Sequence, residues 1–515
     1  KTKVNPFFAT QFLKALHSDG LISFENQAGY WQCNINQVRS AGLTDDVVKF
    51  MVIQLRKLPE STQDILKLAA CIGNEFDLDK LTIISEKSKS EIAACLWKAL
   101  QKGIIQPQSD VYKFFIQAEN QRAIKLHTAE VAKYKFLHDR VQQAAYSLIG
   151  EEQKQKTHWQ IGQALLNKIS EQQLEENLFE VVNQLNNALI FSEQDEIFRE
   201  KITRLNLQAG IKAKVSTAYA AAVSYCNQGI TLLACDSWEY QYELSFELYR
   251  QLAEAEYLNS NFEAAESLVY QIIRKAKSNI EKADLYNLLV VQFTLEGKYD
   301  KAIQVGKEGL SLLGINIPVD DLQFSIEEQL KKVRAEFKQQ EIVSILHKPM
   351  MKQEEIKTAI KLLINLDAPI YITGNLTLYT FFSLKAVLLS LEYGNAAESA
   401  KAYVNYGLIS GTVLGDYQTG YEFGKVAYKL SEIYQSQGQL CKASLILSGW
   451  LYSWNQPIAD AEKFALSGYQ AGLESGEIQF AGYNLFALGC IFHFKGTKLQ
   501  QIQSEISNWL LFAEK

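Results

Sequence analysis

The sequence contains no proline between Pro107 and Pro318, and from about residue 151 to 515 the alternating patterns typical of β-strands disappear. Because proline interrupts helices and alternation marks strands, this stretch predicts helices over most of its length. A short motif recurs in it at steps of roughly 40 residues, longer than the ~34 of a strict tetratricopeptide repeat. The motif is an aromatic residue at a helix start followed three positions later by alanine: Tyr219 and Ala222, Phe262 and Ala265, and Tyr299 and Ala302.

This repeat predicts a tetratricopeptide-like α-solenoid of helix pairs over residues 151–515. In such arrays the small residue lets two helices approach closely, and the aromatic ring fills the gap to the next repeat. The segment 297–314, "GKYDKAIQVGKEGLSLLG", is the clearest copy. Further on, glycines recur at spacings of four and five, and we expect close helix contacts at Gly407, Gly411, Gly415, Gly420 and Gly424.

Residues 44–150 carry a different pattern, in which short helices are followed by two strand-like segments. The first helix is expected behind a Thr44 cap, and a later one, "SEIAACLWKALQKG", opens with a Ser88-x-x-Glu91 capping box. The strand-like segments are "IIQ" and "YKFLH". This order predicts a winged-helix domain, with a generic helical connector as the alternative.

Residues 1–43 form a shorter piece. Asn5 stands at a helix cap position and Pro6 at the first helical position, ahead of "FFATQFLKALHS" with apolar residues at helical spacing. The following "GLISFENQAGYWQCN" alternates and has Gly29 near its middle, which predicts a short hairpin. The whole chain is therefore predicted to be mainly α, a winged helix followed by a helical array.

The composition argues against several functions. Against 52 Lys and Arg stand 58 Asp and Glu, with no basic run long enough to follow a phosphate backbone, so we expect no nucleic-acid partner. The seven cysteines are scattered and never form a C-x-x-C pair, which indicates reduced thiols in a cytoplasmic protein. The most apolar stretch, 376–391, is interrupted by Lys385, so we expect no membrane span. The chain opens with Lys directly on a helical pattern, and we expect it to be part of a longer protein.

Common motifs for catalysis do not occur in the sequence: neither G-x-x-x-x-G-K-[ST], nor the kinase H-R-D and D-F-G, nor H-E-x-x-H, nor G-x-S-x-G. We therefore expect this segment not to be an enzyme, and we assign it no catalytic residue and no cofactor of its own. The six histidines share no i, i+3 or i+4 spacing with one another, so no metal site is expected.

The segment 134–148, "YKFLHDRVQQAAYSL", places an isolated His138-Asp139 pair where alternation gives way to a helix. Asp139 followed at three residues by Gln142 is a capping-box arrangement, which predicts that Asp139 is the helix cap. In a strand, His138 would share a face with Phe136. These neighbours leave open whether His138 senses a ligand or only belongs to the start of a helix.

These residues resemble two elements of STAND nucleotide-binding proteins. Asn5-Pro6 before an amphipathic helix is similar to the G-x-P element of their helical lid, with Val4 in place of the glycine. The "LHD" of residues 137–139 is similar to their M-H-D element, with leucine in place of methionine. In that family the proline packs on adenine and the histidine reaches the ADP phosphates. The resemblance therefore implies nucleotide sensing by Asn5, Pro6 and His138.

Longer phrases carry a second resemblance. "FLHDRVQQAAYSL", "LEYGNAAESAKAYVNYGLISG" and "GDYQTGYEFGKVAYKL" are similar to the central region of large bacterial multi-sensor signalling kinases. Those proteins join a serine/threonine kinase, an AAA/STAND-type ATPase, a tetratricopeptide-like region, a GAF sensor and a histidine kinase.

This second resemblance implies that residues 1–43 end the ATPase lid and that ATP and ADP act on the full-length protein, a serine/threonine and histidine protein kinase. The segment would relay nucleotide or partner state between an upstream nucleotide-binding domain and downstream sensor and kinase domains. The alternative is the sensor part of a STAND-type ATP-dependent transcriptional regulator. Neither identifies the protein or ligand that the helical array binds.

Overall fold

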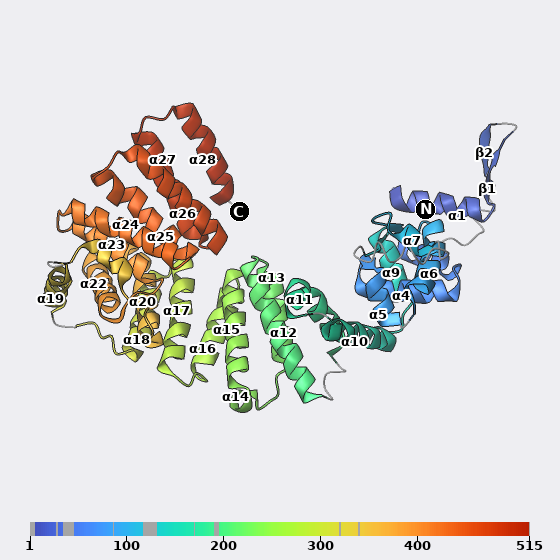
Figure 1. Cartoon of the computed structure of the whole chain (residues 1–515), viewed down its shortest axis with the longest axis horizontal. Coiled ribbons are helices and arrows are strands. Elements are labelled where there is room, and N and C mark those ends of the chain that lie inside the picture. The colour runs from blue at the N-terminus through green and yellow to red at the C-terminus, as the bar shows by residue number, and fades with distance from the viewer. Residues whose placement is uncertain are drawn as a thin grey trace. The chain divides into compact units, whose positions relative to one another are not determined.

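The computed structural model describes residues 6–26, 29–33, 35, 46–85, 87–116, 131–168, 170–189, 195–318, 321–337 and 340–513. The chain forms two compact units, Lys1–Ala209 and Gly210–Lys515 (Figure 1). The fold is mainly α, as predicted, with a winged helix followed by a tetratricopeptide-like array of helix pairs. Every strand in the described residues lies before residue 140, and beyond it an isolated bridge joins Met350 and Asn395.

The first helix, α1 (Pro6–Ser18), begins at Pro6 as expected and is amphipathic. Its residues Phe8, Phe12 and Leu16 recur every four positions and are buried. The centroid of the Phe8 ring lies 5.3 Å from that of Phe50, so α1 packs on the winged helix through an aromatic contact. Asn5, the expected cap of this helix, lies outside the described residues.

A β-hairpin follows α1, as the alternation predicted. Strand β1 (Ile22–Glu25) pairs with β2 (Tyr30–Cys33) in antiparallel register, with Ile22 opposite Cys33. Gly29, directly before β2, has a φ of +73°. Glycine adopts this left-handed conformation without a Cβ clash, which suits it to the turn side of the hairpin.

The winged-helix region arranges short helices around a three-stranded sheet. Its elements are α3 (Val47–Arg56), α4 (Glu60–Ile72), β3 (Glu75–Asp77), α5 (Leu78–Ser85), α6 (Lys89–Gln101), β4 (Ile105–Pro107), α7 (Tyr112–Ile116), β5 (Lys133–Phe136) and α9 (Asp139–Ser147). The sheet order is β3-β5-β4 and both pairs are antiparallel, so the last strand in sequence lies in the centre. A helix, a strand, two helices and two returning strands make up the arrangement of a winged helix.

The sequence pattern does not predict β3, because three residues between two helices leave no alternation to detect. Its central residue Phe76 pairs with Tyr134 of β5, and the two rings stack with centroids 5.9 Å apart. Both rings are buried together with Phe136. The strand therefore forms because the sheet brings these three rings into one core.

Local caps determine where two of these helices begin. Asp46 caps α3 by accepting hydrogen bonds from two backbone N–H groups of the first turn, at 2.8 and 3.2 Å. The expected cap, Thr44, lies outside the described residues. The capping box predicted at α6 is confirmed, because Glu91 Oε2 accepts from the Ser88 N–H at 2.9 Å and the Ser88 side chain accepts from the Glu91 N–H.

Helix pairs make up the rest of the chain. The first unit contains α10 (Glu151–Lys168), α11 (Glu171–Asn186) and most of α12 (Glu196–Val215). The second unit continues with α13 (Tyr219–Thr231), α14 (Ser237–Tyr240), α15 (Tyr242–Leu258), α16 (Phe262–Ile273), α17 (Asn279–Leu295), α18 (Tyr299–Leu312), α19 (Leu322–Glu336), η2 (Ile342–His347), α20 (Glu354–Asn365), α21 (Asp367–Ile372), α22 (Leu376–Tyr393), α23 (Ser399–Thr412), α24 (Tyr417–Ile433), α25 (Gln437–Ile446), η3 (Leu447–Leu451), η4 (Tyr452–Trp454), η5 (Ile458–Ala461), α26 (Glu462–Ser475), α27 (Ile478–Phe494) and α28 (Leu499–Ala513). The first two helices of the array thus belong to the compact unit that holds the winged helix.

The predicted repeat motif marks helix starts in the array. The three aromatic residues of the motif are the first residues of α13, α16 and α18, and the three alanines that follow them are completely buried. A further copy begins α24, where Tyr417 is followed three positions later by Gly420. The sequence pattern missed this copy because glycine takes the place of alanine.

Most of the spaced glycines lie at close helix contacts, as expected. A Cβ on Gly407 would lie 2.8 Å from the carbonyl oxygen of Gly420, so α23 and α24 approach each other backbone to backbone. Gly411 and Gly424 face side chains of neighbouring segments just as closely. The expectation is wrong for Gly415, which lies in the turn between α23 and α24 with a φ of +71° and would meet nothing within 4 Å.

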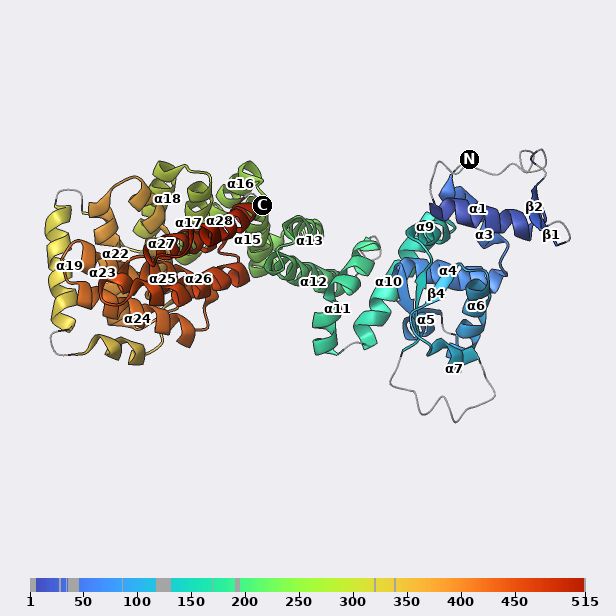
Figure 2. The same ribbon diagram turned by 90° about the horizontal axis from the view of Figure 1, so that it is seen from above.

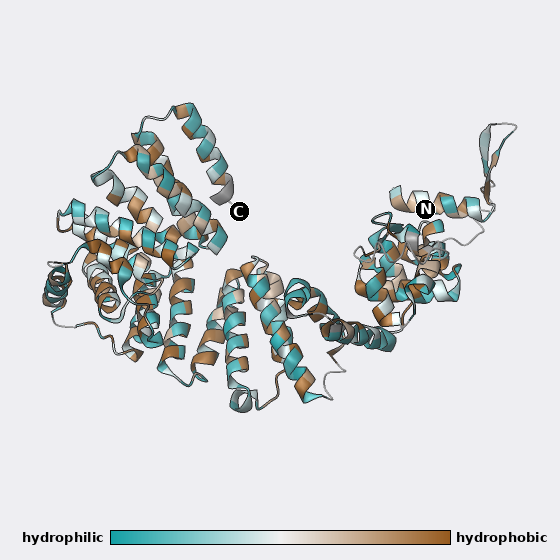
Figure 3. Cartoon of the chain, in the orientation of Figure 1, coloured by the Kyte–Doolittle hydropathy of each residue, from teal (hydrophilic) through white to brown (hydrophobic). Residues whose placement is uncertain are grey.

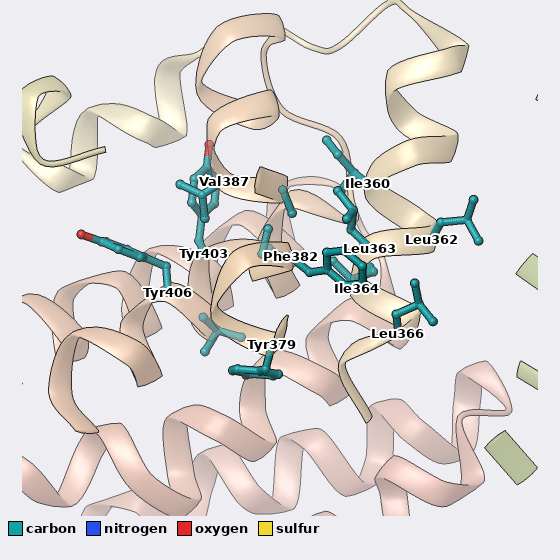
Figure 4. Packing of buried hydrophobic residues seen from close by; sticks show 14 of the residues in the cluster. Ile360, Leu362, Leu363, Ile364, Leu366, Tyr379, Phe382, Val387, Tyr403 and Tyr406 are labelled. Carbon is teal, nitrogen blue, oxygen red and sulfur yellow. The ribbon is translucent and has the colours of Figure 1, made fainter. Parts of the chain in front are cut away.

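The core of the second unit is a continuous cluster of buried side chains, part of which is drawn in Figure 4. Phe382 and Val387 of α22, Leu363 of α20 and Tyr403 of α23 are among its members. Helix α22 is buried around most of its circumference, so its apolar sequence serves packing. None of the described helices combines the length and the hydropathy needed to cross a bilayer. Most of the other helices carry both apolar and polar residues (Figure 3).

Candidate functional site

Helix α9 begins at Asp139, and its N-cap residue His138 lies two residues after the end of β5, the central strand of the winged-helix sheet. His138 keeps an extended backbone, with φ −161° and ψ 152°, and its Nδ1 accepts the backbone N–H of Arg140 at 3.2 Å. The prediction that Asp139 caps this helix is therefore wrong, because the imidazole already holds the N–H that a cap would bind. Asp139 is the first helical residue and is exposed. Gln142, expected to complete a capping box, instead donates to the backbone oxygen of Ala70 in α4 at 3.1 Å.

The cap bond determines how the His138 imidazole can act. An Nδ1 atom that accepts the Arg140 N–H carries no proton, so in the neutral ring the proton lies on Nε2. Asp139 in the first turn adds a favourable charge at the positive end of the helix. The half-buried ring therefore offers one N–H donor beside a stabilised helix start.

His138 lies next to the helix that carries Pro6. Its imidazole stacks on the ring of Phe7, with centroids 4.3 Å apart and ring planes 21° apart. Phe7 is the second residue of α1, and Pro6 before it is exposed. The stack therefore brings two of the residues implicated by the STAND resemblance to neighbouring places on the first unit, whereas Asn5 lies outside the described residues.

A depression of about 360 Å³ adjoins the start of α9. Lys14 of α1, Trp97 of α6, Tyr112 of α7 and Leu137 are among the residues that line it. Leu137 donates its backbone N–H to the oxygen of Ile104 at 3.0 Å, which holds the residue before His138 in place. Gln101 and Gln106 also line the depression, so its lining is mixed and does not select one kind of ligand.

The other end of α9 is joined to α10 and α11 by polar side chains: Tyr146 is half-buried, and His158 and Gln184 are buried. The Tyr146 hydroxyl lies 2.9 Å from His158 Nε2, and His158 Nδ1 lies 2.6 Å from Gln184 Oε1. The Gln184 amide nitrogen donates to the backbone oxygen of Cys71 in α4 at 2.9 Å. Because this bond orients the amide, Oε1 faces His158, and the neutral imidazole donates through Nδ1 and accepts the Tyr146 hydroxyl at Nε2.

Burial favours the neutral form of His158. Loss of hydration lowers the pKa of the imidazole below its ordinary 6.5, and the hydrogen bond to Gln184 acts in the opposite direction. The nearby ammonium of Lys154 lowers the pKa further. The relay from Tyr146 to Gln184 is therefore uncharged at neutral pH.

An ion pair reinforces the junction between the winged helix and the array. Lys80 of α5 lies 2.6 Å from Glu180 of α11, nitrogen to oxygen. Helix α10 also packs on α4 and α5 (Figure 2). One short helix, α9, thus connects the His138–Phe7 stack with the first helices of the array.

Ion pairs connect helices of successive pairs in the second unit. Lys214 Nζ lies 2.8 Å from Glu254, which joins α12 to α15. Asp284 of α17 contacts Arg250 of α15 at 3.6 Å and Lys361 of α20 at 2.9 Å. Each contact joins two helices that different repeats contribute, so these pairs help to define the register of the array.

The series of ion pairs continues toward the C-terminus. Lys401 of α23 lies 2.8 Å from Asp367 of α21, and Lys442 of α25 lies 2.7 Å from Glu477, directly before α27. A depression of about 380 Å³, lined by acidic and basic side chains, lies beside the pairs that involve Asp284. Its mixed charge does not select a ligand of one sign.

Neither a reactive buried thiol nor a metal site is found among the described residues. Burial raises the pKa of the Cys71, Cys226 and Cys441 thiols to about 12, so these thiols are protonated at neutral pH and serve packing. Within the described ranges, no three His, Cys, Asp or Glu side chains gather closely enough to hold a metal ion.

No protein-family model matches the chain. Over 99% of its length the chain is 26% identical to hybrid signal transduction histidine kinase G of Dictyostelium discoideum, in an alignment of 575 residues. The chain spans 17% of the length of that protein. It is also similar to the crystal structure of a signal transduction ATPase with numerous domains (STAND) from Pyrococcus horikoshii that has a tetratricopeptide repeat sensor. That similarity covers 92% of this chain and 65% of the other, with a TM-score of 0.34 and 13% sequence identity.

Proposed function

We propose that this chain is the regulatory middle segment of a multidomain signal-transduction kinase. Its similarity to a hybrid histidine kinase extends over 99% of the chain and 17% of that protein, which supports a segment of a larger protein. In this proposal the kinase domains and a nucleotide-binding domain lie outside these residues, and ATP and ADP bind to the latter. The segment relays the state of that domain, or of a partner bound to the array, to the downstream sensor and kinase domains.

The proposal rests on the contacts that α9 makes at its two ends. At its start His138 stacks on Phe7 of α1, and near its end Tyr146 contacts His158, which contacts Gln184 of the array. The helix is 9 residues long and held by its backbone hydrogen bonds. A shift of His138 relative to α1 would therefore displace the Tyr146 contact as well.

His138 supplies a suitable donor for a phosphate held by the neighbouring domain. Its Nδ1 is engaged in the helix cap, which leaves the Nε2–H for an anionic oxygen. A hydrogen bond to a charged group contributes roughly 1.5–3 kcal/mol, enough to bias a two-state equilibrium by roughly 10- to 150-fold. In the same proposal Asn5 and exposed Pro6 contact the base of the nucleotide.

The test of nucleotide sensing uses the full-length protein loaded with ADP. His138→Ala removes the cap and the donor, His138→Asn keeps a helix cap without the imidazole, and Asp139→Asn changes only the first-turn charge. We expect both His138 variants to release ADP about 10-fold faster or more, and Asp139→Asn to release it like the wild type. If His138→Asn retained ADP as the wild type does, His138 would only start a helix.

The relay is tested separately with Gln184→Leu, which breaks the contact between His158 and the backbone of α4. We expect ADP release to stay unchanged while autophosphorylation of the kinase loses its response to exchange of ADP for ATP. Gln172→Leu, an exposed substitution in the same helix, is the matched control. A Gln184→Leu protein that responds to nucleotide as fully as the control would contradict the relay.

A further inference from the structure

Helix α27 is mostly apolar, and its polar residues are Gln479, Asn484 and His493, besides the hydroxyl of Tyr483. Its 17 residues include no Asp, Glu, Lys or Arg. One side packs on the preceding part of the array, where Ala481, Leu485 and Leu488 are buried. The opposite side is open, and Phe486 and Phe494 on it are 71% and 72% exposed.

The open side of α27 carries a continuous stripe, which we call the α27 stripe. Tyr483, Phe486, Cys490 and Phe494 follow one another at spacings of three and four, so their side chains lie along one face. Tyr483 is also exposed, and Cys490 is half-buried. Single exposed apolar residues are common on protein surfaces, but a helix-long apolar stripe marks a surface that binds something.

Earlier helices of the same array are covered on both sides. Every residue from Ser399 to Gly407 in α23 and from Cys441 to Ile446 in α25 is buried. The reason is that α23 is covered by α24 and α25, and α25 by α26 and α27. Helix α27 has the composition of these interior helices but lacks the cover that a following pair provides.

Helix α28, the last described helix (Figure 1), repeats this observation. Leu499, Ile506 and Leu510 share one face, and Leu499 is 74% exposed. The only charged residue from 499 to 513 is Glu505. A pair that caps a helical array needs a polar outer face, because that face meets water. Helix α28 has exposed polar residues on its opposite side, among them Gln501, Ser504 and Asn508, but the side that carries Leu499, Ile506 and Leu510 is apolar and open.

We infer that the open face of α27 and α28 docks a further amphipathic helix pair of the same array. This inference rests on the proposed function in one respect, since the pair would come from the longer protein. Continuity with the contact between α25 and α27 identifies the occupant, because each earlier step joins apolar helix faces in this way. The absence of charge along α27 disfavours a nucleic acid or an acidic peptide, and it requires an apolar stripe on the occupant.

Thiol labelling tests the inference, because Cys490 lies within the α27 stripe. N-ethylmaleimide is added to the 515-residue chain and to the full-length protein, and the labelled peptides are quantified by mass spectrometry. Cys235, which is exposed away from this face, is the internal control. We expect Cys490 to react in the shorter chain and to react about 10-fold more slowly or less in the full-length protein, while Cys235 reacts alike in both.

A pair of matched substitutions tests the inference through the melting temperature. Phe486→Glu should lower the melting temperature of the full-length protein and leave that of the 515-residue chain unchanged. Phe324→Glu on α19, where the ring is exposed to a similar degree, should change neither. Equal labelling of Cys490 in the two proteins would overturn the inference. Protection of Cys490 from labelling that increases with protein concentration would also overturn it, because a second copy would then cover the face. Neither outcome affects the ADP-release test, so the two proposals fail separately.

Discussion

The ammonium of Lys401 lies 2.8 Å from the carboxylate of Asp367, and the two side chains are only 5% and 9% exposed. Asn405 completes this arrangement: its oxygen accepts from Lys401 at 2.8 Å and its nitrogen donates to Asp367 at 3.1 Å. Buried charges cost several kcal/mol each unless they are paired and hydrogen-bonded. These three side chains therefore form a closed polar unit that joins α21 to α23.

Lys401→Met should destabilise the second unit by about 3–5 kcal/mol, because Asp367 then stays buried without a cation. Chemical denaturation measures the change in the free energy of unfolding. Lys429→Met is the control, since Lys429 pairs with Glu432 on the surface and exposed pairs contribute little to stability. Adding Asp367→Asn to Lys401→Met should recover part of the loss. Equal effects of the two lysine substitutions would contradict the special weight of the buried pair.

Acid should weaken the first unit through His158. The pKa of this imidazole is lowered by burial in the folded chain, whereas the unfolded chain keeps the ordinary 6.5. The unfolded state therefore takes up a proton first, so the contribution of His158 to stability is complete above pH 6.5 and is lost as pH falls toward the folded pKa. Denaturation at several pH values above and below 6.5 should show a steeper loss for the wild type than for His158→Gln. Parallel pH profiles would remove His158 as the cause.

Gly407→Ala should destabilise the array by about 1–3 kcal/mol, because the new methyl group meets the backbone oxygen of Gly420 and α23 must move away from α24. Gly482→Ala is the matched control within a helix, since a Cβ there meets nothing within 4 Å. That substitution should be neutral or stabilise by up to about 1 kcal/mol through helix propensity. The melting temperatures of the two variants provide the comparison. A stable Gly407→Ala protein would show that the two helices do not need their close approach.

The 515-residue chain by itself should bind ATP no more tightly than the millimolar range. Tight phosphate binding needs a glycine-rich loop and a lysine in the pattern G-x-x-x-x-G-K-[ST], which its sequence does not contain. Isothermal titration of the chain with ATP and with ADP is the measurement. A micromolar dissociation constant for either nucleotide would contradict the division of roles between this segment and a separate nucleotide-binding domain.

Local patterns in the sequence were enough to predict the helical array. An aromatic residue followed three positions later by a small residue, as in Phe262 and Ala265, marks the start of a helix. The small residue also marks a position where the helix is buried against a neighbour. Glycine size alone predicted the approach of α23 to α24 at Gly407. The same patterns placed the hairpin, the capping box at Ser88 and the order of most winged-helix elements. Each of these features depends on residues within one or two helical turns of one another. They can therefore be predicted from a single sequence.

The tertiary structure decided which distant groups meet around α9. Gln184 binds the backbone of Cys71, which lies 113 residues earlier, and Phe7 stacks on His138. His138 caps α9 in place of Asp139. The extended backbone that follows β5 places the imidazole of His138 beside the first N–H groups of the helix. Burial repeats with the period of a helix or strand, and the sequence therefore reveals which side chains are buried. Which buried or half-buried side chains contact one another depends on how the elements pack, and no local spacing encodes that.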